Sequence, residues 1–259
     1  IASSPVRMYF QIFVTCHDPS LGKVDKSTLS QQTLMELFIN DIEQCEIICG
    51  DPDTPNDVSK WSGVHINGAG DVWKIDFNRR RLIGSLDLNW LPSSVRFINC
   101  QCNRLYGSIG TKNLPSNLRS MMFDTNSLTG EVSLDTLPPS LEVLALSDNR
   151  LEGSLSLTHL PDTLVRLYLN SNKFSGTIDL TRLPRRMHTL HLGANLLSGE
   201  VDVSKLPDGL AELDLGGNDF EELEYSFLPS SIIDLTVVCN ERSGSLYEIR
   251  IMKDAEETA

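Results

Sequence analysis

The sequence lacks most of the features that would mark a membrane, nucleic-acid or metal protein. No uncharged apolar run is long enough to cross a bilayer. Lys and Arg number 22 against 35 Asp and Glu, a net charge of -13, which phosphate backbones repel. We therefore expect no membrane span and no direct binding of nucleic acid. The 40% hydrophobic content is that of a folded chain and excludes intrinsic disorder.

Cysteine and glycosylation patterns are also sparse. The six cysteines contain no Cys-x-x-Cys pair, and we interpret them as free thiols; they are Cys16, Cys45, Cys49, Cys100, Cys102 and Cys239. Sixteen asparagines form no Asn-x-Ser/Thr acceptor site, which weighs against a secretory route. We therefore expect no metal and no cofactor, and favour an intracellular protein, cytoplasmic or organellar, over a secreted one.

What the sequence does contain is a repeat. The dipeptide Leu-Pro recurs at a spacing of 23 residues, with one last step of 22, and begins at residues 91, 114, 137, 160, 183, 206 and 228. Asparagines follow in frame at positions 103, 126, 149, 172, 195, 218 and 240, and a glycine lies four residues after most of them. The consensus is L-P-x-x-L-x-x-L-x-L-x-x-N-x-L-x-G-x-L.

Each consensus position has a physical role. The L-x-x-L-x-L run places alternate apolar side chains on one face of a short strand, and such units bury that face only by stacking into a parallel sheet. The in-frame asparagine is expected to bond backbone groups of the turn between neighbouring coils. The glycine permits a tight turn. The segment after it, such as residues 176–180, alternates again and predicts a second, shorter ladder of strands.

These repeats resemble the leucine-rich repeat family. The L-x-G-x-[LIV] portion is similar to the plant-type subclass, and the likeness covers roughly residues 69–250. It implies a mainly β, right-handed solenoid with a parallel concave sheet, short second strands on the convex side and an N-terminal α-helical cap. The expected organisation is an arm and cap at residues 1–68, eight repeats at 69–250 and a frayed tail at 251–259.

The N-terminal cap has its own pattern. Apolar residues at helical spacing predict a helix over about 28–44, capped by Ser27 or Thr28. Two alternating runs predict a hairpin at about 61–77. Helix, Trp-x-Gly-Val and hairpin resemble the cap of plant-type leucine-rich repeat proteins, but the paired cysteines of that cap are missing here. At the other end, Leu246, Ile249 and Ile251 are expected to supply a closing strand.

Outward-facing strand positions form columns on the expected concave sheet. Two neighbouring coils bring together a group rich in the residue types of interface hot spots, namely Arg166, Tyr168, Asn170, His188 and His191. An ordinary solvated sheet face is the alternative interpretation. Asp214 follows His191 in the central column, so the two also suggest a metal site or a base with its orienting carboxylate. No nucleophile or phosphate-loop motif accompanies them, and we expect no enzyme.

Two further surfaces are candidates for binding a partner. Nine acids and no Lys or Arg lie between residues 206 and 241, among them Glu221, Glu222 and Glu224, so a basic partner would be attracted there. A solubilising acidic face is the alternative. Trp90 and Phe227 are bulky at a position that is polar in five of seven repeats, either packing on the ends or anchoring another chain.

From these features we expect a non-enzymatic protein–protein interaction module, a scaffold or subunit of a larger assembly with a protein partner. The alternative is the ligand-sensing ectodomain of a plant-receptor-like protein.

Overall fold

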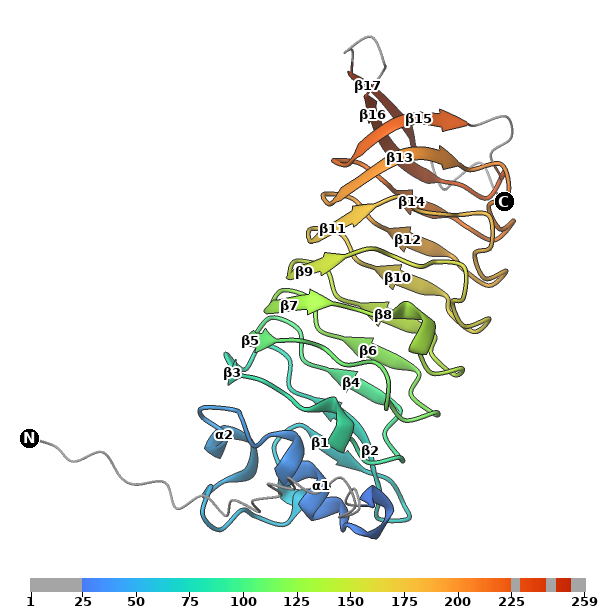
Figure 1. Cartoon of the computed structure of the whole chain (residues 1–259). Helices are drawn as coiled ribbons and strands as arrows, with labels where there is room; N and C mark the ends of the chain where they lie inside the picture. Colours follow the sequence, from blue (N-terminus) through green and yellow to red (C-terminus); the bar gives the residue numbers. More distant parts are fainter. Residues whose placement is uncertain (1–24, 225–228, 241–245, 253–259) are drawn as a thin grey trace, which may run out of the picture.

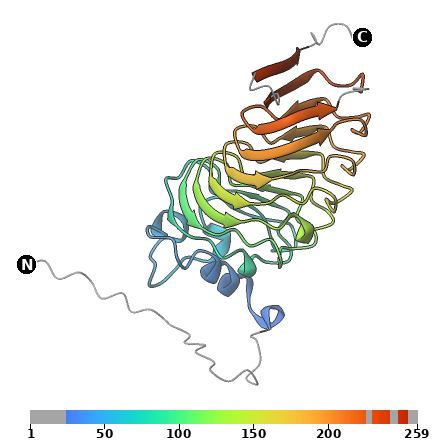
Figure 2. The ribbon, with the colours of Figure 1, turned by 45° about the horizontal axis from the view of Figure 1, so that its top comes forward.

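The computed structural model describes residues 25–224, 229–240 and 246–252 and shows a β-solenoid. Figure 1 shows its coils stacked in sequence order from the helical N-terminal end to β16 and β17. Figure 2, turned by 45°, shows the strands of successive coils lying side by side along the stack. The expected mainly β leucine-rich repeat architecture is confirmed.

One strand of each coil joins a parallel sheet that we call the concave sheet. Its strands are β2 (Val72–Asp76), β4 (Phe97–Asn99), β6 (Ser120–Met122), β8 (Val143–Ala145), β10 (Arg166–Tyr168), β12 (Thr189–His191), β14 (Glu212–Asp214) and β16 (Asp234–Asn240). The register advances by 23 residues from β2 to β14, as in the pair Leu144 and Leu167, and by 22 at the last step, where Leu213 pairs with Leu235. The predicted strand positions are therefore confirmed.

In most coils the second ladder lies earlier than the sequence predicted. Its strands are β3 (Ile83–Gly84), β5 (Arg104–Gly107), β7 (Ser127–Glu131), β9 (Arg150–Gly153), β11 (Lys173–Gly176), β13 (Leu196–Asp202) and β15 (Asp219–Glu224). In the coil of β11, for instance, the strand ends at Gly176 and the expected segment 177–180 has no strand. Gly176 has φ 85° and ends the strand there, instead of opening it. In β13, by contrast, the strand continues past Gly199 to Asp202 and pairs with β15, so the prediction holds in that coil.

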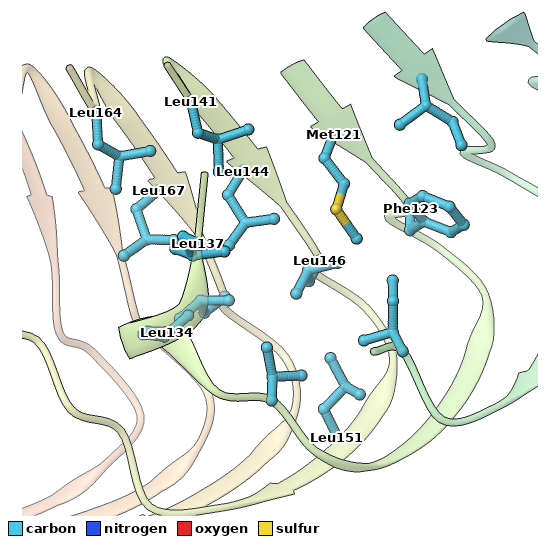
Figure 3. Close-up of a cluster of buried hydrophobic side chains, with 14 of the residues drawn as sticks. Met121, Phe123, Leu134, Leu137, Leu141, Leu144, Leu146, Leu151, Leu164 and Leu167 are labelled. Atoms are coloured by element: carbon cyan, nitrogen blue, oxygen red, sulfur yellow. The ribbon is translucent and has the colours of Figure 1, made fainter. Parts of the chain in front are cut away.

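The core is a continuous column of apolar side chains between the two ladders. Each coil contributes leucines from its strand and its Leu-Pro turn, and Figure 3 shows Leu141, Leu144, Leu146 and Leu151 directed into this interior. These four side chains are fully buried. Each Leu-Pro closes its coil with a turn in which the proline carbonyl accepts the N–H three residues on, as Pro138 does from Leu141 at 3.0 Å. Leucine therefore supplies the core and proline the bend.

A ladder of asparagine side chains links the coils. The amide nitrogen of Asn172 donates to the carbonyls of Leu146, 3.0 Å away in the preceding coil, and of Leu169, 3.1 Å away in its own. Its amide oxygen accepts the N–H of Leu151 at 3.0 Å. The same pattern holds for Asn103, Asn126, Asn149, Asn195 and Asn218. The repeat predicts that both Asn149 and Asn172 are buried despite their polarity; Asn172 is buried, whereas Asn149 is only half-buried.

The residue before the ladder asparagine adopts a left-handed backbone in each coil from 102 to 217. The φ angles at Cys102, Thr125, Asp148, Ser171 and Ala194 lie between 52° and 56°, and only Gly217 is the residue type that this conformation favours. The strain is tolerated because the asparagine that follows is held by several hydrogen bonds.

The N-terminal end of the core is covered by short helices. These are the 3-10 turn η1 (Lys26–Thr28), α1 (Gln31–Phe38), α2 (Glu46–Cys49) and the 3-10 turn η2 (Val58–Lys60). Met35 and Phe38 are fully buried, and the Phe38 ring stacks on Phe77 of the first coil at 6.4 Å. Ile42 bridges Gly84, where any side chain would overlap the Asp41 carbonyl.

Two details differ from the predicted helix over 28–44. The helix ends at Phe38, because residues 39–45 turn to pair with β3, and it begins at Gln31. Its N-cap is Ser30, whose hydroxyl accepts the N–H of Thr33, and not Ser27 or Thr28. The two runs after the cap form an antiparallel pair between β1 (Val64–Ile66) and β2. At the far end β17 (Leu246–Met252) pairs antiparallel with β16.

The asparagine ladder makes a stability prediction. Replacing Asn172 with Ala leaves the Leu151 N–H and two or more carbonyls without partners inside the solenoid, so the free energy of unfolding should fall by about 3 kcal/mol. Denaturant unfolding measures this value.

The matched control is Asn170→Ala, two residues earlier. The Asn170 side chain is half-buried and accepts one bond, from the Ser147 hydroxyl at 2.5 Å. Its loss should cost about 1 kcal/mol or less. Equal losses in the two variants would contradict the role of the ladder.

Candidate functional site

Three neighbouring coils place a row of interacting side chains on the concave sheet. Tyr168 of β10 is in register with His191 of β12, and their rings meet edge to face at 5.1 Å and 83°. The His191 Nε2 atom lies 3.4 Å from the Glu212 carboxylate of β14. The side chains of His191 and Glu212 are 30% and 36% exposed. We call Tyr168, His191 and Glu212 the tyrosine–histidine row.

His191 does not pair with Asp214, the arrangement that would have suggested a metal site or a base with its orienting carboxylate. The two residues are in register, but the Asp214 carboxylate accepts the Gly216 N–H at 2.9 Å. Gly193 leaves room for this carboxylate, since a β-carbon there would lie 2.5 Å from it. Among the described residues no three metal-binding side chains gather.

The other predicted residues of this group, Arg166, His188 and Asn170, lie beside the tyrosine–histidine row on or next to β10 and β12. Arg166 is exposed on β10, two residues before Tyr168 on the same face. His188 is also exposed and lies just before β12, with its Nδ1 atom 3.2 Å from the Thr189 hydroxyl. Asn170 is held by Ser147, as described above. The predicted residues therefore lie on β10 and β12 or directly beside them. The side-chain contact among them is the edge-to-face contact of Tyr168 with His191.

The acidic stretch is divided between the two ladders. Glu212 and Asp214 lie on the concave sheet, whereas Glu221, which is exposed, lies in β15 of the second ladder. Glu222 and Glu224 are also in β15, and their side chains lie outside the described ones. The run in the sequence therefore does not form a single surface.

Trp90 lies at the end of the 3-10 turn η3 (Leu88–Trp90) and is half-buried against the core. A second such turn, η4 (Leu134–Thr136), occupies the same place two coils on. Phe227 lies outside the described residues. The geometry of Trp90 is that of a packing residue.

A polar side-chain network runs along the edge of the concave sheet. Asp124 accepts the Gln101 side-chain amide at 2.5 Å and the Ser147 N–H at 3.0 Å, and burial raises its pKa despite these bonds. Asp76 behaves oppositely. Burial opposes its ionisation, but hydrogen bonds from Asn78 and Lys74 and the Lys74 charge outweigh burial and lower its pKa.

Sequence reasoning missed a hollow at the N-terminal end of the concave sheet. Its volume is about 300 Å³, and it is lined by Trp73, Lys74, Asp76, Phe97, Ile98, Asn99, Ser120 and Met122. Trp73 and Phe97 meet edge to face at 5.6 Å. The signal in the sequence was the presence of Phe97 and Met122 at outward-facing positions of consecutive coils.

Comparisons with known proteins place this architecture. No family model matches the sequence, and no curated protein does. The structure is similar to PEPR1 in a crystal structure of PEPR1-AtPEP1, with a TM-score of 0.57, 21% identity and coverage of 73% of this chain and 28% of that one. It is also similar to Pollen Receptor Kinase 3, with a TM-score of 0.56, 24% identity and coverage of 76% and 97%. The chain has the leucine-rich repeat fold.

A third leucine-rich repeat structure is the ectodomain of the plant membrane receptor kinase GASSHO1/SCHENGEN3 from Arabidopsis thaliana, with a TM-score of 0.47, 21% identity and coverage of 74% and 30%. The likeness to Pollen Receptor Kinase 3 contradicts the intracellular location that the sequence favoured, and we withdraw that location. Within the described residues, no helix combines the length and apolar character that a membrane crossing requires.

The two network aspartates give opposite pH predictions. At pH 7 Asp124→Asn should raise the free energy of unfolding, because the raised pKa reports a buried charge that destabilises the fold; Gln101 can turn its amide to keep the bond. Asp76→Asn should lower the free energy of unfolding at the same pH. Urea unfolding at steps between pH 7 and about 3 measures both.

Acid should remove both differences. The Asp124 penalty is full above its folded pKa and absent below the ordinary aspartate value of about 3.9, so the gain of Asp124→Asn vanishes as pH falls. The Asp76 contribution is present above that value and is lost as pH falls through its lowered pKa. Differences of the same sign for the two variants would refute this assignment.

Proposed function

We propose that this leucine-rich repeat domain is a non-catalytic ligand-recognition module whose concave sheet binds a protein or peptide. The observation that carries the proposal is the tyrosine–histidine row. It places a phenol, an imidazole and a carboxylate next to one another on three adjacent strands, where they are partly exposed. Tyrosine is among the residues that dominate interface energies.

The sheet beneath the row is suited to recognition. The apolar core and the asparagine ladder fix its strands from the inside of the solenoid, so a ligand meets side chains that are already in place and their ordering costs little. Strands spaced about 4.8 Å apart bring Tyr168, His191 and Glu212 within the reach of one extended segment. A polypeptide laid across the strands is therefore the ligand that fits this geometry.

The ligand-sensing alternative has more support than the scaffold interpretation. The similarity to PEPR1, seen in a PEPR1-AtPEP1 structure, and to Pollen Receptor Kinase 3 supports a receptor-like role. We include an extracellular setting in the proposal on the same ground.

The absence of catalysis is part of the proposal. His191 and the Glu212 carboxylate beside it are both partly open to water, a poor setting for a general base. We propose no cofactor and no direct binding of nucleic acid. A basic segment of the ligand would lie at the C-terminal coils, where Glu212 and Asp214 add negative charge to the concave sheet.

Selection from a displayed random-peptide library tests the proposal. Peptides enriched on the purified chain should lose about 30-fold in affinity when Tyr168 is changed to Ala, the loss typical of a hot spot. Isothermal titration of individual peptides gives the dissociation constants.

Tyr106→Ala is the matched control, because Tyr106 is an exposed tyrosine of β5 in the second ladder. It should leave the dissociation constants unchanged. Peptides that lose affinity with Tyr106→Ala and keep it with Tyr168→Ala would show that recognition takes place on the second ladder. Failure to enrich any peptide would count against polypeptide recognition.

A further inference from the structure

We propose that the hollow lined by Trp73, Phe97, Ser120 and Met122 is an anchor site for a tyrosine side chain of a polypeptide ligand. This inference rests on the proposed function and names a ligand feature that the function alone does not give. The hollow lies on β2, β4 and β6 of the concave sheet. Its central strand, β4, is four strands away in that sheet from β12, the central strand of the tyrosine–histidine row.

The wall of the hollow selects an aromatic guest. Trp73 and Phe97 are bulky, partly exposed and fixed edge to face at 5.6 Å, and Met122 is also half-buried beside them. The ring of a guest would extend this edge-to-face arrangement. Aromatic pairs prefer edge-to-face contact over face-to-face stacking. Methionine adds a favourable sulfur–aromatic contact. The volume of about 300 Å³ is at the lower end of small-ligand pockets and is suited to one side chain.

A polar group in the hollow has no partner. The Ser120 hydroxyl is buried without a hydrogen bond, and the residue is 5% exposed. Buried hydroxyls are rarely left unpaired, so this one needs an explanation. Thr189, the other buried hydroxyl residue in the same column, has the His188 ring 3.2 Å from its oxygen. Ser120 instead lines the hollow, where a guest can supply a donor or an acceptor.

The charges beside the hollow are already neutralised. The Lys74 ammonium lies 3.2 Å from the Asp76 carboxylate, which also accepts the Asn78 amide at 2.5 Å. A charged guest would have to compete with this pair, so a neutral one is favoured. Tyrosine is neutral, aromatic and ends in a hydroxyl. A phenyl group satisfies the wall but leaves Ser120 unpaired.

An NMR titration of the whole chain tests the anchor with two probes, N-acetyl-tyrosinamide and N-acetyl-phenylalaninamide. The indole N–H signal of Trp73, assigned by its loss in Trp73→Phe, should shift and saturate with both. The tyrosine probe should bind about fivefold more tightly, the worth of one neutral hydrogen bond. No saturable shift of Trp73 would overturn the proposal.

Ser120→Ala separates recognition from structure. This variant should bind the tyrosine probe about fivefold more weakly, no better than the phenylalanine probe, while its unfolding midpoint stays the same or rises, because the free protein loses no bond. Unchanged tyrosine affinity would refute the proposal, as would a lowered midpoint, which would reveal an internal partner. Tyr168→Ala should leave both probes unaffected.

The outcomes distinguish this inference from the function beneath it. If Trp73 does not respond but selected peptides still depend on Tyr168, only the anchor fails. If Trp73 responds as expected and no peptide is ever enriched, the hollow binds a free phenol and the polypeptide assignment is lost.

Discussion

The hydrogen bonds of the ladder asparagines are the interaction on which the rest of the structure depends. Each coil leaves backbone N–H and carbonyl groups inside the solenoid at the point where the chain leaves the concave strand, and no second strand is there to pair with them. Six asparagine side chains, from Asn103 to Asn218, meet these groups in their own coil and in the one before. The bonds between coils align neighbouring strands, and hence the columns that face outward.

A solenoid held in this way needs separate solutions at its two ends. Every internal coil is covered by two neighbours, but the first and last would expose their leucines. At the N-terminal end Met35 and Phe38 cover the core, and the backbone after α1 pairs with β3 through the Glu43 N–H, 2.9 Å from the Ile83 carbonyl. At the other end the antiparallel strand β17 occupies the edge of β16. The outward columns between these ends are free to differ from coil to coil, which allows a tyrosine–histidine row and an aromatic hollow on one sheet.

The sequence predicted repeated structural features better than features that occur once. The concave strands and the asparagine ladder follow from a period that occurs many times, and both were predicted. In most coils the second ladder was placed too late, because L-x-G-x-L alternates on both sides of the glycine while the strand ends at that glycine or one residue after it. The helix was made too long because apolar residues such as Ile42 continue its spacing, although Ile42 lies in a turn and bridges β3.

Single-occurrence features were harder to predict. His191 and Asp214 are correctly adjacent in register, yet the imidazole lies beside Glu212, because the N–H of Gly216 holds Asp214. The hollow depends on side-chain directions at three coils and on one unpaired hydroxyl, neither of which a spacing reports. Local rules thus predict the scaffold, and the site requires coordinates.

Hydrogen exchange at the side-chain amides of the asparagines tests the central claim most directly. In the intact chain the Nδ2 protons of Asn103, Asn172 and Asn195 should exchange far more slowly than those of the exposed Asn40 and Asn113, because the first three donate to carbonyls inside the solenoid. Similar exchange rates for the two groups would mean that the ladder bonds do not persist in solution. The stacking of the coils would then need another cause.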